Sequence, residues 1–227
     1  MSLPFPPNEW QWRDRNNVVM PWFTRPMLDV LEAAARWPVD VPNPHFSLGG
    51  SRVFEWGMGY STLWWAEYAA WIDAVDSNEE WVRTIRVEDG RITNGQTRLM
   101  YGSIDISRHE GTKGRLRHCT GEAYESAIDG RGFYDIIVID GERRYECALK
   151  AMAHIQPGGI IILDNSEENP AIHELFRFNV SHTFPQPGHP HWCTTYWKIT
   201  QFGAPPASAE IATAEHKQRR LAEGGWG

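Results

Sequence analysis

The sequence predicts an α/β fold built on a doubly wound, mostly parallel sheet with helices on both faces. Two apolar segments, 52–56 and 134–139, each stop at a polar edge that contains glycine. A third apolar segment, 160–163, stops at Asp164 and Asn165. Runs of this kind suit strands that are buried on both faces, as in a parallel sheet. Because ligands bind at the carboxyl ends of such strands, we expect one site where the three ends meet.

Strands and helices are expected to alternate along the chain. Pro26 occupies a first-turn position and begins a helix that runs to about Trp37. The other strands are expected at 71–75 and 97–101, and the helices from 61 or 62 and at 78–85, 122–128, 145–154 and 171–177. Two late strands, near 180–184 and 194–199, are expected to form an antiparallel edge at the C-terminal end of the sheet. The stretch 102–121 is expected to be a polar connection with several glycines.

The length of 227 residues suits one sizeable domain and leaves little room for a second. We divide the chain into an N-terminal cap and helix at 1–45, a main domain at 46–202 and a C-terminal tail at 203–227. Tryptophan is abundant, with 12 residues, and several precede the first strand. They are expected to pack in the cap, although an aromatic wall for a planar substrate is the alternative.

Composition excludes several classes of function. The formal charge of −7 argues against an extended phosphate-binding surface, so no nucleic-acid partner is expected. The apolar runs are strand-sized and far shorter than the roughly 20 residues that cross a membrane, so no membrane segment is expected. The three cysteines form no CxxC pair, and the N-terminus lacks the features of a signal peptide, which predicts a cytoplasmic protein.

The turn after the first strand carries the first candidate site. Gly57 and Gly59 directly follow the strand and precede a helix, where Ser61 or Thr62 can cap the exposed N–H groups. Backbone without side chains can pass close to a ligand there, and a helix N-terminus attracts an anion. Asp76 lies about twenty residues further on, at the end of the second strand, where a carboxylate can accept hydrogen bonds from ribose hydroxyls. The set predicts an adenosine-containing cofactor.

Two residues decide between a dinucleotide and another adenosine cofactor. The dinucleotide pattern GxGxxG requires a third glycine, but position 62 is threonine. Glu55 also places a carboxylate beside the turn, which opposes a pyrophosphate. An acidic residue suits a positively charged group instead, such as the α-ammonium of a methionine moiety.

The ordered set of motifs resembles the class I S-adenosylmethionine-dependent methyltransferases, over roughly 52–166. Segment 55–59 matches the first motif of that family, 135–140 the motif of its fourth strand, and 157–159 the turn before its fifth strand. The resemblance implies a Rossmann-like domain at 46–202 that binds S-adenosylmethionine, with cofactor contacts from Glu55, Gly57, Gly59, Ser61, Asp76 and Asp140. A plain strand-to-helix turn and a solvated Asp76 are the structural alternative.

A second candidate site lies where the fourth and fifth predicted strands end. Asp140, Asp164 and Asn165 offer two carboxylates and an amide oxygen, which are hard ligands suited to Mg²⁺ or another divalent cation. The arrangement is similar to the metal site of the catechol and caffeoyl-coenzyme A O-methyltransferases. A cation there would lower the pKa of a substrate hydroxyl. Cofactor positioning or helix capping without a metal is the alternative for both acids.

The chain departs from those enzymes after the fourth strand. They carry a lysine that can act as a base, whereas this chain has Glu142, Arg143 and Arg144. Arginine stays protonated, so either the metal suffices, or another residue is the base, or the arginines bind an anionic substrate group. A solvated helix start paired with neighbouring acids is the alternative. The segments 139–147 and 164–166 also resemble a less characterised branch of the superfamily.

Catalytic candidates are therefore Asp140, Arg143 and His191, the last in a loop that we expect to reach the cofactor. Asp105 or Glu122 could approach the adenine. The hypothesis is a methyltransferase acting on a small-molecule hydroxyl, with a divalent metal as an option. The rivals are a non-catalytic protein that binds S-adenosylmethionine and a nicotinamide-dependent oxidoreductase. The acceptor and the oligomeric state, including a homodimer, are left open.

Overall fold

The structure is a computed structural model, and it describes residues 13–14, 16–36, 46, 48–93, 98–101 and 111–200. The strands are β1 (Arg52–Trp56), β2 (Trp71–Asp76), β3 (Leu99–Tyr101), β4 (Gly114–His118), β5 (Tyr134–Ile139), β6 (Ile155–Leu163), β7 (Val180–Gln186) and β8 (His189–Lys198). The α-helices are α1 (Arg25–Arg36), α2 (Tyr60–Tyr68), α3 (Glu79–Ile92), α4 (Glu122–Glu125), α5 (Arg144–His154) and α6 (Pro170–Leu175). Two short 3₁₀ helices, η3 (Ser126–Ile128) and η4 (Ser166–Glu168), complete the described elements.

All eight strands form one sheet in the order β3-β4-β2-β1-β5-β6-β8-β7. The pairings from β3 through β6 are parallel, whereas β8 runs antiparallel to β6 and β7 antiparallel to β8. The predicted fold class is therefore confirmed, including the antiparallel C-terminal edge. The chain order reverses between β1 and β5, and a reversal of this kind is where doubly wound sheets bind ligands.

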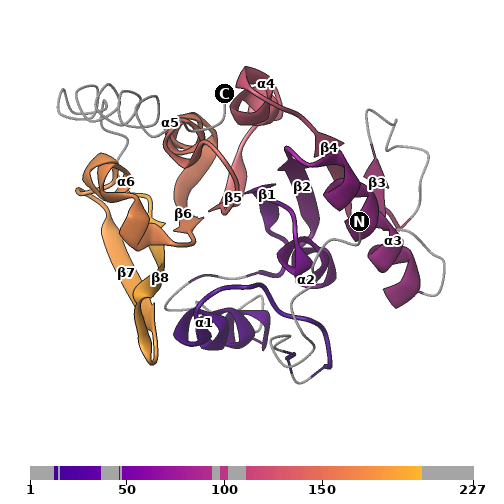
Figure 1. The fold of residues 1–227 in the computed structure, drawn as a ribbon, viewed down its shortest axis with the longest axis horizontal. Helices are drawn as coiled ribbons and strands as arrows, with labels where there is room; N and C mark the ends of the chain where they lie inside the picture. Colours follow the sequence, from indigo (N-terminus) through magenta and orange to yellow (C-terminus); the bar gives the residue numbers. More distant parts are fainter. Residues whose placement is uncertain are drawn as a thin grey trace.

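The sheet is covered on both faces, as Figure 1 shows: α1 and α2 lie on one side, and α4 and α5 on the other. Neighbouring residues of one strand enter different cores because side chains alternate between the faces of a sheet. In β1, Val53 joins the core under α1, α2 and α3, whereas Phe54 and Trp56 join the core under α5 and α6. The strands are thus buried on both sides, as their continuous apolar runs predicted.

Helix α1 packs against the sheet. Its apolar residues Met27, Leu28 and Leu31 are buried in the same core as β1, so this part of the predicted N-terminal cap packs directly on the sheet. The predicted tail at 203–227 lies outside the described residues, and so do residues 1–12, 15 and 37–45 of the cap. Among the described helices, none has the length and apolarity that crossing a bilayer requires.

Strand β4 was not predicted from the sequence. It lies within the stretch that was expected to be a connection, and it pairs with β2 on one side and β3 on the other. Only Leu116 supplies an apolar side chain to the core, while Arg115 bonds to the buried Asp73 through Nε, at 2.8 Å from Oδ1. A strand whose alternate side chains are arginines lacks the apolar pattern that identifies strands in a sequence.

Two other elements are longer than expected. Helix α3 extends to Ile92, beyond the expected end at Ile85. Strand β8 begins at His189, so the segment that was expected to be a loop is part of an antiparallel hairpin with β7. This hairpin carries residues 189–194 past the end of β6, because the last residue of β6, Leu163, pairs with Thr195.

Candidate active site

Most of the predicted site residues lie at or just after the carboxyl ends of four neighbouring strands, β2, β1, β5 and β6. The turn that follows β1 contacts the end of β5 directly. Gly57 donates its N–H to Val75 O at 3.0 Å, and Asp140 N–H donates to Trp56 O at 2.9 Å. The first and second candidate sites therefore adjoin each other.

Packing within the protein, without any ligand, already requires glycine at position 57. Its φ is +90°, and a Cβ built there would lie 2.6 Å from Gly141 N and 2.7 Å from Asp140 C. A side chain would therefore collide with the backbone that follows β5. Gly57 was predicted to let a ligand approach the backbone, and in the structure it also allows the ends of β1 and β5 to contact each other.

Gly59 differs from Gly57. Its backbone is extended, with φ at −169°, and a Cβ built there would have Ser61 Oγ as its nearest neighbour at 3.6 Å. The described protein atoms leave space at this position for an alanine. A side chain at Gly59 would therefore not collide with the described protein atoms, but it would take up space that a ligand on the turn could occupy.

Asp76 fixes the turn to the second strand. Its Oδ2 accepts the N–H of Met58 at 2.8 Å, and its Oδ1 accepts the N–H of Asn78 at 2.8 Å. Burial raises the pKa of this carboxyl, and the two N–H donors oppose the rise. Each oxygen keeps a further lone pair, so the carboxylate can still accept from hydroxyl groups of a ligand.

Glu55 is fully buried beneath the turn. The Thr62 hydroxyl donates to Glu55 Oε2, and the Gly59 N–H donates to Thr62 Oγ1 at 3.2 Å. Burial raises the pKa of Glu55 to about 7, although nearby hydroxyls of Ser61 and Thr62 oppose the rise. The second oxygen, Oε1, has no hydrogen-bond partner within the described part of the chain. A buried oxygen of this kind needs a donor, which a cationic ligand group would supply.

Thr62 takes the position where a dinucleotide-binding turn would have its third glycine. Its hydroxyl links the carboxylate of Glu55 to the start of α2, and the side chain itself is buried. An acid at this point, held by the first turn of the helix, disfavours a pyrophosphate on the helix N-terminus.

An acidic cavity of about 240 Å³ lies at the ends of β5 and β6. It is lined by Trp22, Asp140, Asp164, Asn165 and Trp192. Burial raises the pKa of Asp164 to about 6, although the Thr194 hydroxyl donates to its Oδ1 at 2.6 Å. The pKa of Asp140 is raised well above its usual range, first by burial and then by the charge of Asp164. The structure thus brings the three predicted metal ligands together.

Arg144 contacts the same three residues. Its Nη2 lies 3.6 Å from Asp140 Oδ1 and 3.2 Å from Asn165 Oδ1, and its Nη1 lies 2.6 Å from the carbonyl oxygen of Asp164. The positive charge lowers the pKa of both acids and so opposes the effect of burial. This arginine is therefore neither a solvated helix start nor paired with Glu142 or Glu146.

The side chain of Arg143 contacts Glu125 and does not line the acidic cavity. Its guanidinium makes a two-fold contact with the Glu125 carboxylate, through Nε to Oε2 and through Nη2 to Oε1 at 3.0 Å. Glu146 lies at 4.0 Å from the same guanidinium. The alternative of pairing with neighbouring acids therefore describes Arg143, and the geometry does not bring it to the acidic cavity.

His191 was predicted as a base, but the structure leaves it exposed in β8 and outside the lining of the acidic cavity. Its neighbour Trp192 lines the cavity instead, because adjacent residues of a strand face opposite sides. Trp192 was not predicted as a site residue, and Trp22 was counted only among the tryptophans that precede the first strand. Of the two adenine candidates, Asp105 lies outside the described residues and Glu122 is exposed at the start of α4.

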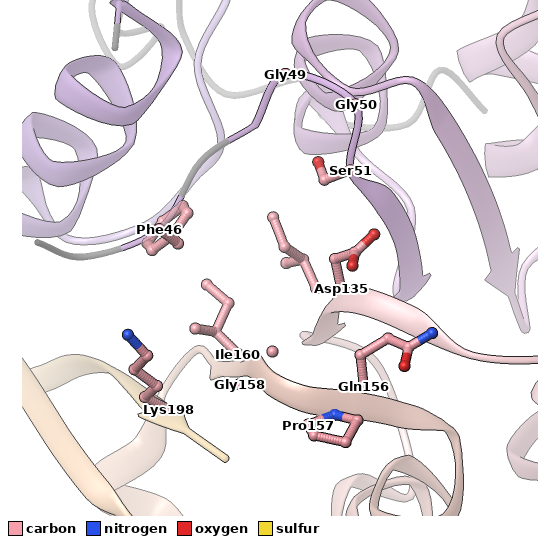
Figure 2. A pocket seen from close by; sticks show the side chains of 12 residues that line it. Phe46, Gly49, Gly50, Ser51, Asp135, Gln156, Pro157, Gly158, Ile160 and Lys198 are labelled. Carbon is pink, nitrogen blue, oxygen red and sulfur yellow. The ribbon is translucent and has the colours of Figure 1, made fainter. Parts of the chain in front are cut away.

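A second cavity, of about 390 Å³, lies near the amino ends of β1 and β5, at the opposite end of these strands from the acidic cavity. Figure 2 shows Phe46 and Lys198 on one side of it and Asp135 and Gln156 on the other. Asp135 is already engaged, since its Oδ2 accepts the N–H of Arg52 at 2.8 Å. Parallel sheets bind ligands at the other edge, so we do not treat this cavity as the active site.

At the level of sequence, no family model and no curated protein matches the chain. At the level of structure, the O-methyltransferase TomG of tomaymycin synthesis from Streptomyces achromogenes, solved with SAM, is 14% identical with a TM-score of 0.50, over 66% of this chain and 74% of that chain. An O-methyltransferase from Bacillus cereus, solved with SAH, is 16% identical with a TM-score of 0.51, over 75% of this chain and 89% of that chain. The precorrin 8w decarboxylase of Methanobacterium thermoautotrophicum is 16% identical with a TM-score of 0.52, over 86% of this chain and all of that chain.

Identities this low show the fold alone. Together with the strand order, they show that the chain has the Rossmann-like fold of the class I methyltransferases.

Proposed function

We propose that the protein is an S-adenosylmethionine-dependent methyltransferase that methylates the hydroxyl group of a small molecule. The observation that carries the proposal is the contact between the glycine turn and the end of β5, where a Cβ on Gly57 would lie 2.7 Å from the backbone of Asp140, a residue that lines the acidic cavity. A cofactor held on the turn would therefore face an acceptor held in the cavity. The two neighbouring O-methyltransferases, solved with SAM and SAH, support the same cofactor.

The chain's own residues fit the cofactor. Glu55 offers a buried oxygen without a partner, which suits the α-ammonium of the methionine moiety. The open face of Gly59 leaves room for that moiety, and Ser61 adds a hydroxyl in the first turn of α2. Asp76 can accept from ribose hydroxyls. When bound, S-adenosylmethionine supplies an electrophilic methyl group on a sulfonium.

The acidic cavity fits an acceptor with a planar ring. Trp22 and Trp192 line it beside the two carboxyls, and aromatic side chains pack well against flat apolar groups. Asp164, with its pKa raised to about 6, is a stronger base than an ordinary aspartate and remains ionised near neutral pH. We assign to Asp164 or Asp140 the acceptance of the hydroxyl proton. Arg143 and His191 are left out because neither faces the cavity.

A divalent metal is also left out of the proposed mechanism. Asn165 Oδ1 and Asp140 Oδ1, two of the three predicted ligand atoms, already face the guanidinium of Arg144. These residues do not fit a cation of the same sign in the same place. The cytoplasmic location and the absence of a nucleic-acid partner stay predictions.

The test is release of S-adenosylhomocysteine from S-adenosylmethionine in the presence of a panel of phenols, catechols and aliphatic alcohols. We expect turnover with at least one aromatic hydroxyl compound. Trp192→Ala should raise the KM for that acceptor and leave the affinity for S-adenosylhomocysteine unchanged. Phe133→Ala is the matched control, because it removes an exposed aromatic residue at the opposite edge of the sheet. Cofactor binding without turnover on any acceptor would instead favour the non-catalytic alternative.

A further inference from the structure

We propose that Arg144 is a built-in cation that takes the place of a divalent metal at the ends of β5 and β6. The consequence is that the natural protein has no divalent-metal site there, and that removing the arginine creates one. The inference rests on the contacts of Arg144 and does not depend on the proposed function.

The guanidinium directs its hydrogen-bond donors at the residues that follow β5 and β6. Its Nε donates to Gly141 O at 2.9 Å and its Nη1 to Asp164 O at 2.6 Å. Both terminal nitrogens also donate to Asn165 Oδ1, at 3.3 Å from Nη1 and 3.2 Å from Nη2. Nη2 further contacts the backbone oxygen of Asp140 at 3.4 Å. With its donors directed at the protein, the group acts here as a fixed charge.

The contacts with Arg144 leave the side-chain oxygen of Asn165 little capacity to bind a metal. An amide oxygen has two lone pairs, and in this structure two N–H groups of one guanidinium point at Asn165 Oδ1. A metal at a bond length of about 2 Å from that oxygen would come within about 5 Å of Nη2, which lies 3.2 Å from the same atom. Repulsion between a divalent ion and the guanidinium at this range is strong in a partly buried site.

The charged groups at the cavity also disfavour a metal. Asp140 and Asp164 place two carboxyl groups at the cavity, and the guanidinium of Arg144 supplies a positive charge next to both residues. Asn165 has a φ of +46°, in the left-handed region that asparagine adopts more readily than most residues, and its Oδ1 accepts from both terminal nitrogens of Arg144. The arrangement is therefore a built ion pair with an amide bridge, and a metal would have to displace it.

The experiment measures Mn²⁺ binding by electron paramagnetic resonance and by thermal shift, using the full chain. Arg144→Ala removes the cation and opens space beside two carboxylates and an amide. We expect it to bind Mn²⁺ at least about tenfold more tightly than the natural protein, because the repulsion has been removed. Arg144→Lys keeps the charge and should bind as weakly as the natural protein.

Arg143→Ala is the matched control, since it makes the same change of charge one residue away, at a group paired with Glu125. It should leave Mn²⁺ binding unchanged. Adding Asp164→Asn to Arg144→Ala should abolish the gained binding, which assigns it to this cavity. Arg144→Gln replaces Arg144→Ala if circular dichroism shows that the alanine variant is unfolded.

Two results would overturn the inference. The first is tight Mn²⁺ binding by the natural protein that Asp164→Asn removes. The second is a folded Arg144→Ala or Arg144→Gln variant with no gain in Mn²⁺ binding. Neither result depends on whether the protein transfers a methyl group.

Discussion

Substituting Gly57 by alanine should destabilise the protein through the contact between the turn after β1 and the end of β5. The native φ of +90° disfavours a residue with a side chain, at a cost of about 1–2 kcal/mol. The added methyl group would also lie 2.6 Å from Gly141 N and 2.8 Å from Asp140 O, atoms of a backbone that can move only if β5 moves. Overpacking of this kind costs about 1–3 kcal/mol.

The two effects together predict a loss of about 2–5 kcal/mol in the free energy of unfolding. For a chain of this length the loss corresponds to a fall of about 4–20 °C in Tm. The assay is urea denaturation followed by tryptophan fluorescence, with thermal melting by circular dichroism as the second probe. A Gly57→Ala variant within about 0.5 kcal/mol of the natural protein would refute the geometry of the turn.

Gly59→Ala is the matched control for stability and a probe of the ligand. Its methyl group would have 3.6 Å to the nearest protein atom, and its extended backbone suits any residue. We expect a change in stability of less than about 0.5 kcal/mol. We expect the affinity for S-adenosylhomocysteine to fall at least about tenfold, because the methyl group would occupy space assigned to the ligand. Unchanged affinity would remove Gly59 from the cofactor site.

Three further substitutions test single contacts of the site. The folded pKa of Glu55, about 7, lies above its ordinary value of 4.5, so its contribution to stability falls as pH rises from about 4.5 to 7 and stays lost above that window. Glu55→Gln should thus be more stable than the natural protein by about 1–3 kcal/mol at pH 8 in urea titrations, with weaker S-adenosylhomocysteine binding; equal stability at pH 8 would contradict the burial argument. Thr194→Val removes the hydroxyl that donates to Asp164 and accepts the N–H of Thr24, and should cost about 1–3 kcal/mol in the same titration. Asp76→Asn should weaken calorimetric binding of S-adenosylhomocysteine about ten- to hundredfold, and an unchanged affinity would count against the ribose assignment.

Much of the fold could be predicted from local pattern. The apolar runs at 52–56 and 134–139 correspond to β1 and β5, because strands buried on both faces need apolar side chains at every position. The acids that end the strands were found for the same reason, since each run stops abruptly at a polar residue. Strand β4 could not be found this way, because it carries arginines at alternate positions, and their partners, Asp73 for Arg115 and the backbone oxygen of Ala127 for Arg117, lie on other elements.

The site was predicted only in part, since its remaining features depend on long-range packing. The sequence places Arg143 and Arg144 side by side, but only the structure shows that one turns to Glu125 and the other to Asn165. Trp192 lines the cavity because β8 extends past the end of β6, and the pairing that produces this is antiparallel and distant in sequence. A strand was predicted at 194–199, but its extension back to His189 was not, because Pro190 suggested a loop.

The central claim is that the turn after β1 holds a sulfonium nucleoside and not a dinucleotide. Calorimetric titration of the natural protein with S-adenosylhomocysteine and, separately, with NADH tests it most directly. The account predicts one site for S-adenosylhomocysteine with a micromolar Kd, lost in Gly59→Ala, and no measurable heat with NADH. Saturable binding of NADH without binding of S-adenosylhomocysteine would contradict the account.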